Sequence, residues 1–528
     1  MNKIIFLISI SVLCVLHCSA QNDLNEHTYS YNIKNYGALG DGVSIDTKAI
    51  NAAISDCVKH GGGTVYVPAG TYVTGSFQLF SNVNLYLSAG AIILASKDTG
   101  SYFYEKDYDF SGIGAGERIG VVFAHNATNV SISGSGVIDG NGLSFMYKDS
   151  LQRGTDYDKK YTRQGNDYMN NKYGTKDDPL QWKGDYQNRL GIVVIFASCK
   201  KVKVNDITIK NAGNWSMAFL DCNDGKVKGI SIDNNMSIPN SDGIDSYNST
   251  NLIISDCDIR AGDDALAISA SRNVTVSNCN LFSRSCGIRV GYNALDGNNS
   301  GNLLFNNIRI YGSNRGIGIF QRMKGDMENM IFSNMIIDTR LYTGQWWGHG
   351  EPIHISALPG IGSKEVGQIK NIKFSDIVAT GEEGIVLYGS RESILKNISF
   401  DNIQLTLKNG PLTNAYGGNF DLRPTNDVSL GIFKHDIPAL YAKDINSLSI
   451  RNTTVHWQDA ISDIFSNALE LENIEGINID GFRGDAAIAD KPAISLKNSK
   501  DVYINDAKTF AGKNIRLYKE NAENIEIH

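Results

Sequence analysis

Apolar and polar residues alternate along most of the chain, within a nine-residue unit that recurs many times. Each copy begins with Asn, has an aliphatic residue or Phe at its second, fourth and ninth positions, and has Asn or Asp at its sixth. Alternation with a period of two is typical of β-strands. Clear copies begin 22, 29, 27, 42 and 26 residues apart, at Asn251, Asn273, Asn302, Asn329, Asn371 and Asn397. Weaker copies lie at 201–209, 445–455, 473–479 and 501–504.

A strand-containing unit of this length cannot bury its own apolar face, so we expect successive units to stack on a shared core. The sequence therefore predicts an all-β solenoid, a parallel β-helix. A leucine-rich-repeat solenoid is the competing architecture, but its Leu-rich consensus is missing. Equivalent residues should form ladders about 4.8 Å apart. Cys257 and Cys279 are equivalent in this way, and we expect stacked buried thiols there rather than a disulfide.

The N-terminal part departs from the repeat and predicts a cap for the solenoid. Five apolar residues recur with helical spacing between Asp46 and Lys59, behind the helix-capping pair Asp46-Thr47. A short helix there would cover the open end of the first coil, which solenoids require. A strand is expected next, at Thr64–Val67. Residues 145–190 also lack the repeat and are rich in Tyr, Asp and Lys, so they are predicted to be a long ordered insertion over one face.

The first 20 residues are typical of a secretory signal. Lys3 precedes an apolar stretch, and Ser19-Ala20 offers a cleavage site. The stretch is shorter than the roughly 20 residues that span a bilayer, and no later segment is long enough. Lipid modification of Cys18 is the less favoured alternative, because Leu16-His17 is a poor match to a lipobox. We expect an exported protein, periplasmic or extracellular, without a transmembrane segment.

After cleavage, residues 21–528 are predicted to form one β-helix domain, with 410–528 as its C-terminal coils. Its composition argues against several classes of protein. The full chain of 528 residues has 49 Lys and Arg against 56 Asp and Glu, a formal net charge of −7, which does not suit a nucleic-acid binder. Six cysteines remain after position 20, without CxxC or His-rich spacing, so neither a disulfide scaffold, a metal site nor a cofactor is expected.

The repeat interval brings particular polar residues together. Asp242, Asp264 and Cys286 are each 22 residues apart, and Arg315 follows 29 residues later, which are the intervals of the local repeat. We therefore expect these four side chains to lie one above another on successive coils.

With Asp263, this column gives three carboxyl groups within about two coils. Crowded carboxylates raise the pKa of one of them, and a protonated acid beside an ionised partner is what glycoside hydrolysis requires. The alternative is a solvated, Asp-rich turn; the alignment favours function. Asp263 and Asp264 would point to opposite faces of a regular strand, so the backbone is expected to bend at Gly262.

These residues carry a resemblance to a known family. The stretch Asn-Ser-Asp-Gly-Ile-Asp at 240–245, followed by Gly-Asp-Asp at 262–264, resembles the signature of family 28 glycoside hydrolases, the polygalacturonase family. The motifs at 35–42 and 61–72 are similar to the same group, and the resemblance runs from about residue 30 to 410. It implies a right-handed, pectin-lyase-like β-helix that cleaves galacturonide or related bonds in pectic polysaccharides with inversion.

The resemblance also implies roles for the carboxyl groups. Asp263 would be the general acid, and Asp242 and Asp264 would position and deprotonate the attacking water. Acid and base in inverting enzymes stand about 6.5–9.5 Å apart.

The chain departs from the family at two places. Cys286 stands where the family has His, and Gly318-Ile319-Phe320 stands where it has the Arg-Ile-Lys that grips the substrate carboxylate. Gly and Phe do not replace an Arg and a Lys, so we expect the acid–base trio to be kept while substrate recognition differs. The candidates for binding the substrate are Asn240, Cys286, Arg289, Arg315, Trp346, Trp347, His349 and Glu351.

The two tryptophans lie in a Gly-rich polar loop that suits stacking on sugar faces, and His349 and Glu351 could bind hydroxyls. The partner is expected to be a polysaccharide or oligosaccharide, and the oligomeric state stays open. Two alternatives remain. One is a β-helix polysaccharide lyase that holds calcium on its Asp cluster and uses an Arg base, and the other is a carbohydrate-binding solenoid without catalysis.

Overall fold

The computed structural model describes residues 30–103, 108, 119–151, 160–170, 182–184, 189–292, 297, 299–343, 346–459 and 461–528. The predicted secretory segment and much of the predicted insertion lie outside these residues.

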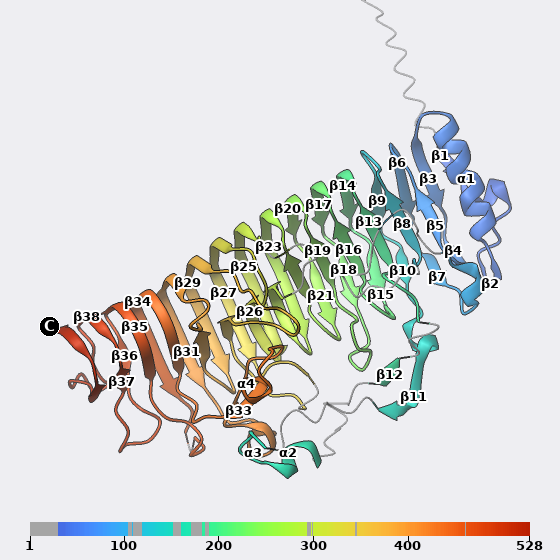
Figure 1. Ribbon diagram of the computed structural model, residues 1–528. Coiled ribbons are helices and arrows are strands. Elements are labelled where there is room, and N and C mark those ends of the chain that lie inside the picture. The colour runs from blue at the N-terminus through green and yellow to red at the C-terminus, as the bar shows by residue number, and fades with distance from the viewer. Residues whose placement is uncertain are drawn as a thin grey trace, which may run out of the picture.

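The described chain winds into an elongated solenoid whose strands stack in parallel, with the N-terminal coils at one end and the C-terminal coils at the other (Figure 1). The all-β, parallel β-helix prediction is confirmed. Each coil contributes to three stacks of strands. The first stack consists of β1 (Ser30–Asn32), β3 (Gly63–Val67), β6 (Val83–Leu87), β9 (Ser131–Gly134), β14 (Lys200–Asn205), β17 (Asn223–Lys228), β20 (Thr250–Ser255), parts of β23 (Arg272–Ser283), β25 (Gly301–Ser313), β27 (Met327–Thr339), β29 (Ile369–Gly381), β31 (Leu395–Leu407), β34 (Leu440–Trp457) and β35 (Leu469–Asp480), and β38 (Lys500–Asn505) and β40 (Glu523–Ile527).

The second stack begins at the edge that α1 and β2 mark in Figure 1. It consists of β2 (Asp41–Ile45), β4 (Gly70–Thr74), β7 (Ala91–Ala95), β10 (Val137–Asp139), β15 (Thr208–Lys210), β18 (Ser231–Asp233), β21 (Asp258–Ala261), the later parts of the long strands from β23 to β34, and β36 (Arg483–Gly484).

The third stack carries the motifs that the sequence singles out. It consists of β5 (Phe77–Leu79), β8 (Val122–His125), β13 (Val194–Ala197), β16 (Met217–Leu220), β19 (Ile244–Tyr247), β22 (Leu266–Ser269), β24 (Cys286–Gly291), β26 (Arg315–Gln321), β28 (Ile353–Ala357), β30 (Ile385–Tyr388), the starts of β34 and β35, β37 (Ile494–Lys497) and β39 (Leu517–Glu520).

The Asn that opens each repeat sets the turn of the chain. These residues adopt left-handed backbone angles, with φ from 52° to 59°, a conformation that Asn tolerates better than other non-glycine residues. Each side-chain amide donates to the side-chain oxygen of the Asn one coil earlier, at 2.9–3.2 Å from Asn273 through Asn397. The Asn side chains that open successive repeats therefore form a ladder of amides on the surface, as their equivalent positions in the repeat predict.

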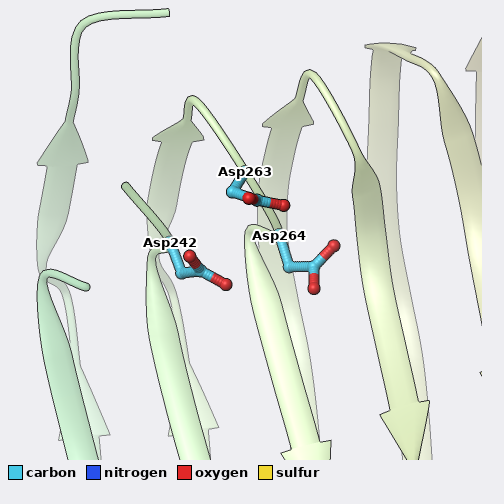
Figure 2. A group of neighbouring side chains, drawn as sticks. All are labelled: Asp242, Asp263 and Asp264. Atoms are coloured by element: carbon cyan, nitrogen blue, oxygen red, sulfur yellow. The ribbon is translucent and has the colours of Figure 1, made fainter. Parts of the chain in front are cut away.

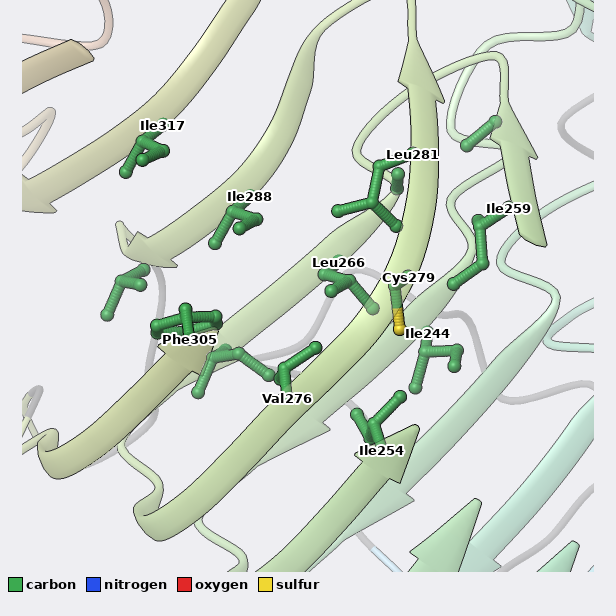
Figure 3. Packing of buried hydrophobic residues seen from close by; sticks show 14 of the residues in the cluster. Ile244, Ile254, Ile259, Leu266, Val276, Cys279, Leu281, Ile288, Phe305 and Ile317 are labelled. Carbon is green, nitrogen blue, oxygen red and sulfur yellow. The ribbon is translucent and has the colours of Figure 1, made fainter. Parts of the chain in front are cut away.

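Apolar side chains from all three stacks fill the interior as one continuous core (Figure 3). Its most regular part is a ladder of stacked rings. The centroids of Phe305 and Phe332 are 4.6 Å apart, and Phe374 follows at 5.1 Å. Cys257 and Cys279 are buried free thiols, as predicted.

The N-terminal cap is the helix α1 (Thr47–Lys59), which buries the five apolar residues of the predicted face. The helix prediction is confirmed, but the Asp46 side chain does not cap the helix. Its carboxylate instead accepts hydrogen bonds from the amides of Leu39 and Gly40, at 2.7 and 3.0 Å, and so ties the preceding loop to the helix start.

Loops and short elements gather along one side of the solenoid (Figure 1). They include the short helices α2 (Asn166–Asn170), α3 (Thr413–Tyr416) and α4 (Val428–Gly431), and two antiparallel pairs, β11 (Met146–Leu151) with β12 (Trp182–Gly184) and β32 (Asn419–Asp421) with β33 (Ile432–Lys434). Short 3₁₀ turns also occur at 33–36, 99–101 and 142–145. Arg163 bonds Asp436 at 2.7 Å, and the Tyr168 ring meets Tyr416 at 5.0 Å. The part of the insertion around 163–168 thus packs on C-terminal loops some 250 residues away in sequence. No helix among the described residues is long and apolar enough to cross a membrane.

Shortening one ring of the aromatic ladder should destabilise the solenoid. Phe332→Ala removes a fully buried side chain between two stacked rings, and such changes cost about 3–5 kcal/mol. The neighbouring Ile331 is 44% exposed, so Ile331→Ala is the matched control, with an expected change within about 0.5 kcal/mol. Denaturant unfolding followed by circular dichroism measures both. Equal destabilisation by the two variants would contradict the assignment of the core.

Candidate active site

The site is built by the register of four neighbouring strands in the third stack. Ile244 pairs with Leu266, Leu266 with Ile288, and Cys286 with Arg315. Asp242 and Asp264 each precede these paired residues by two positions, so they occupy the same level as Cys286 and Arg315. The structure thus agrees with the column that the repeat interval predicts.

The three aspartates meet at the turns that lead into β19 and β22 (Figure 2). One carboxylate oxygen from each of Asp242, Asp263 and Asp264 lies within 4.8 Å of the other two. Both neighbours, Asp263 and Asp264, reach the cluster because the chain bends at Gly262 and Asp263. Gly262 fits this bend because a Cβ there would lie 2.8 Å from the carbonyl oxygen of Ile238. The bend expected at Gly262 is confirmed.

The three carboxyl groups have different surroundings. Asp264 is buried, and its oxygens accept hydrogen bonds from the Arg289 Nε and from the backbone amide of Cys286, the latter at 3.1 Å. Asp263 is partly exposed and accepts a hydrogen bond from the backbone amide of Asn240 at 3.3 Å. Asp242 is buried, and its Oδ1 has no hydrogen-bond partner.

These surroundings separate the protonation states. Burial, and then the charge of Asp264, raise the pKa of Asp263 to about 7. Burial and the neighbouring carboxylates raise the pKa of Asp242 well above its usual range, although Arg289 opposes this. The geometry therefore supplies carboxyl groups that stay protonated near neutral pH beside one that is paired with a guanidinium.

The cluster is tighter than the resemblance implies. The nearest oxygens lie within 4.8 Å, whereas acid and base carboxyl groups stand about 6.5–9.5 Å apart in inverting glycosidases. The spacing of these atoms alone does not point to inversion.

The two arginines that were predicted to bind the substrate, Arg289 and Arg315, are buried and bonded to protein groups instead. Arg289 and Arg315 are 6% and 1% exposed. Arg289 pairs with Asp264, and the Arg315 Nη2 bonds Glu351 Oε1 at 2.7 Å and the carbonyl oxygen of Asp421 at 2.9 Å. Arg322, also buried, donates to four backbone carbonyls and one hydroxyl, on Pro424, Gln321, Ser356 and Leu422.

The loop at 339–352 differs from its expected use in sugar binding. Trp346 is 2% exposed and packs under the loop, and its carbonyl oxygen accepts a hydrogen bond from Arg423. His349 and Glu351 are also buried. Burial alone would raise the pKa of Glu351, but Arg315 outweighs it and holds the pKa at about 2. These three side chains hold the loop in place and do not face a sugar.

Trp347 is the exception in this loop, because it is only partly buried. Its ring meets Tyr292 edge to face, with centroids 5.3 Å apart. Tyr292 follows β24 directly, and its phenol lies within electrostatic reach of Asp263. Asn240 is exposed beside the same cluster. Of the predicted binding residues, Asn240 and Trp347 are therefore the ones placed to meet a substrate.

Sequence reasoning missed several residues that shape the site. Asp245 is part of the recognised motif and pairs with Arg289 at 3.9 Å, which its spacing from Arg289 could have indicated. Asp421 and Arg423 pair at 2.7 Å and anchor the loop, but they lie outside the repeat and give no sequence signal.

Within the described residues, Asp242, Asp263 and Asp264 are also the group of carboxylates that could hold a metal ion. Oxygen ligands suit a hard cation such as Ca²⁺. Arg289 already places a positive charge on Asp264, which reduces the attraction for a second cation.

The structure is thus a parallel β-helix with a three-carboxylate cluster at the start of neighbouring strands. Comparison with known proteins identifies the family. The chain belongs to glycosyl hydrolases family 28, whose sequence profile matches residues 104–419. A second profile, rhamnogalacturonase A/epimerase, pectate lyase-like, matches residues 30–155. The family expected from the motifs is confirmed.

Individual relatives agree with this assignment. A probable polygalacturonase of Vitis vinifera is 30% identical over 48% of this chain and 47% of its own. An exo-poly-alpha-D-galacturonosidase of Dickeya chrysanthemi is 29% identical over 45% of this chain and 42% of its own. The chain thus matches less than half the length of these relatives. The solved family 28 exopolygalacturonase of Yersinia enterocolitica has the same fold, with a TM-score of 0.60 and 17% identity over 94% of this chain and 78% of its own.

The elevated pKa of Asp263 predicts a pH-dependent stability. Between the ordinary pKa of Asp, about 3.9, and about 7, the folded state binds a proton that the unfolded state has released, so stability falls as the pH rises through this range. Asp263→Asn removes this dependence, and we expect a higher melting temperature than wild type at pH 7.5 and little difference at pH 4. Thermal unfolding across this range tests it, with the exposed Asp258→Asn as control. A gain for Asp258→Asn as large as that for Asp263→Asn would contradict the assignment.

Proposed function

We propose that the protein is an exported glycoside hydrolase that cleaves galacturonide-type or related bonds in pectic polysaccharides or their oligosaccharides. The observation that carries this proposal is the cluster of Asp242, Asp263 and Asp264, whose carboxyl groups converge while their protonation states differ. Family membership and the relatives named as polygalacturonases support the substrate class.

We propose Asp263 as the general acid. It is the partly exposed member of the trio, so a glycosidic oxygen can reach it, and a pKa of about 7 keeps it protonated in mildly acidic and neutral solution. A proton donor is most effective when its pKa lies near the working pH.

Asp264, with its carboxylate paired to Arg289, is the proposed base that deprotonates the attacking water. Asp242 lies beside it, and we assign it the positioning of that water. Because both oxygens of Asp264 already accept hydrogen bonds from protein donors, this carboxylate is better suited to orient water than to form a covalent bond with a sugar. Direct attack by water inverts the anomeric centre.

Substrate recognition is proposed to differ from that of a plain polygalacturonase. Arg289, Arg315 and Arg322 are buried and bonded to protein groups, so none of them is placed to bind a uronate carboxylate. Trp347 and Tyr292 instead offer aromatic surface beside the acids, which suits the apolar faces of a sugar ring. We therefore expect pectic substrates with neutral sugars next to the scissile bond to be cleaved better than homogalacturonan.

Replacing the proposed acid should abolish hydrolysis. Asp263→Asn keeps the shape of the side chain but cannot donate the proton, and loss of general acid catalysis lowers rates by about 10²–10⁴-fold. Release of reducing ends is measured from homogalacturonan, rhamnogalacturonan and branched pectic side chains, with Asp258→Asn as a control that keeps wild-type activity.

The same panel separates the alternatives. Wild-type activity that Asp263→Asn retains would overturn the role of Asp263. Products with near-ultraviolet absorbance, formed only without a chelator, would instead identify a calcium-dependent lyase. Binding of a glycan without any release would identify a carbohydrate-binding solenoid.

The stereochemistry of the product tests the role of Asp264. The first product formed should have the anomeric configuration opposite to that of the cleaved bond. Proton nuclear magnetic resonance, recorded before mutarotation equilibrates the anomers, distinguishes the two. A retained configuration would mean that one of the aspartates attacks the sugar directly and would contradict the proposed mechanism.

A further inference from the structure

A buried ion pair between Asp245 and Arg289 lies next to the carboxylate cluster. Asp245, Ala267 and Arg289 occupy equivalent positions on β19, β22 and β24. Because Ala267 has only a methyl group, Arg289 can extend back across its coil. The Arg289 Nη2 comes within 3.9 Å of Asp245 Oδ1, and its Nε donates to Asp264 Oδ2.

The guanidinium is held on its other edge as well. Its Nη1 donates to the carbonyl oxygen of Gly291 at 2.7 Å and to the Ser269 hydroxyl at 3.3 Å. Burial lowers the pKa of Arg289, but Asp264 and further acidic neighbours more than offset this, so the side chain stays charged. Arg289 is thus a fixed cation that touches Asp264 and does not reach the surface.

Asp245 is unusual because burial raises its pKa well above the usual range, and Arg289 is the neighbouring charge that opposes this. It is fully buried, and neither of its oxygens has a hydrogen-bond partner. A buried carboxylate without hydrogen bonds is costly unless a nearby charge compensates it. Its ion-pair partner is Arg289, and burial keeps it from touching a substrate.

We propose that Asp245 and Arg289 form a positioning pair, in which Asp245 fixes Arg289 and Arg289 orients Asp264 for deprotonating water. The inference rests on the proposed function, because it assigns Asp264 as the base. The groups that face Arg289 are Asp242, Asp245, Tyr247, Asp263, Asp264, Cys286 and Tyr292.

Asp245→Asn tests the pair with an isosteric change. We expect kcat on the cleaved pectic substrate to fall at least tenfold while KM changes less than twofold, because the substrate does not touch Asp245. The melting temperature should not fall, because the change replaces a buried carboxyl group whose oxygens make no hydrogen bonds.

Glu383→Gln is the matched control. Glu383 is 1% exposed, lies just before β30 in the same stack, and also has a carboxylate oxygen without a hydrogen bond. The charges that act on it are those of Glu351, Arg315 and Asp421 rather than those of the acid cluster. This control should keep the wild-type kcat and KM. If Asp245→Asn behaves like wild type, or if both variants lose kcat to the same extent, the proposal is overturned.

Two further measurements keep the test decisive. Should Asp245→Asn fail to fold, Arg289→Lys replaces it. Lys keeps the charge but cannot make the same set of bonds, so kcat should fall with KM preserved, and an unchanged kcat would overturn the proposal.

Should wild type cleave no glycan, the proposed function fails, and ¹³C titration of the aspartate carboxyl groups still tests the pair. Signals of the cluster should then shift in Asp245→Asn but not in Glu383→Gln, and equal spectra would refute the pairing.

Discussion

The parallel register of the third strand stack is the constraint on which the rest of the site depends. Hydrogen bonding from β19 through β22 and β24 to β26 places residues that are 22 or 29 positions apart at one level. A shift of one residue would turn each side chain to the other face. The continuous core and the Asn ladder hold this register, so the same packing that stabilises the solenoid also assembles the carboxylates.

This arrangement brings three carboxyl groups together in a buried place, where each of them has different neighbours. Asp264 is paired with the guanidinium of Arg289. The pKa of Asp263 is raised to about 7, and the pKa of Asp242 is raised well above its usual range. Three chemically identical side chains thereby become different reagents. Burial is the largest cause of the two raised pKa values. Arg289 lies against Asp264 and is itself backed by Asp245.

Much of the fold and the core of the site could be predicted from the sequence. Strand periodicity gave the β-helix, and the fixed repeat interval placed Asp242, Asp264, Cys286 and Arg315 in one column, because a solenoid converts spacing into position. The repeat interval could not predict the direction in which each side chain points. Arg289 and Arg315 were expected to bind substrate, but they point into buried ion pairs with Asp264 and Glu351. The partners of the 339–352 loop, such as Asp421 and Arg423, come from a region without the repeat, so their contacts with Trp346 and Gly348 had no signal.

The proposed mechanism requires neighbouring carboxyl groups in this cluster to differ in protonation, and the titration of Asp263 measures that difference. The measurement is the pH dependence of aspartate carboxyl ¹³C signals in wild type and in Asp263→Asn. We expect a wild-type signal that titrates near pH 7 and is missing from Asp263→Asn. If the signal that the variant lacks titrates near 4, as for an ordinary aspartate, the account of the site is contradicted.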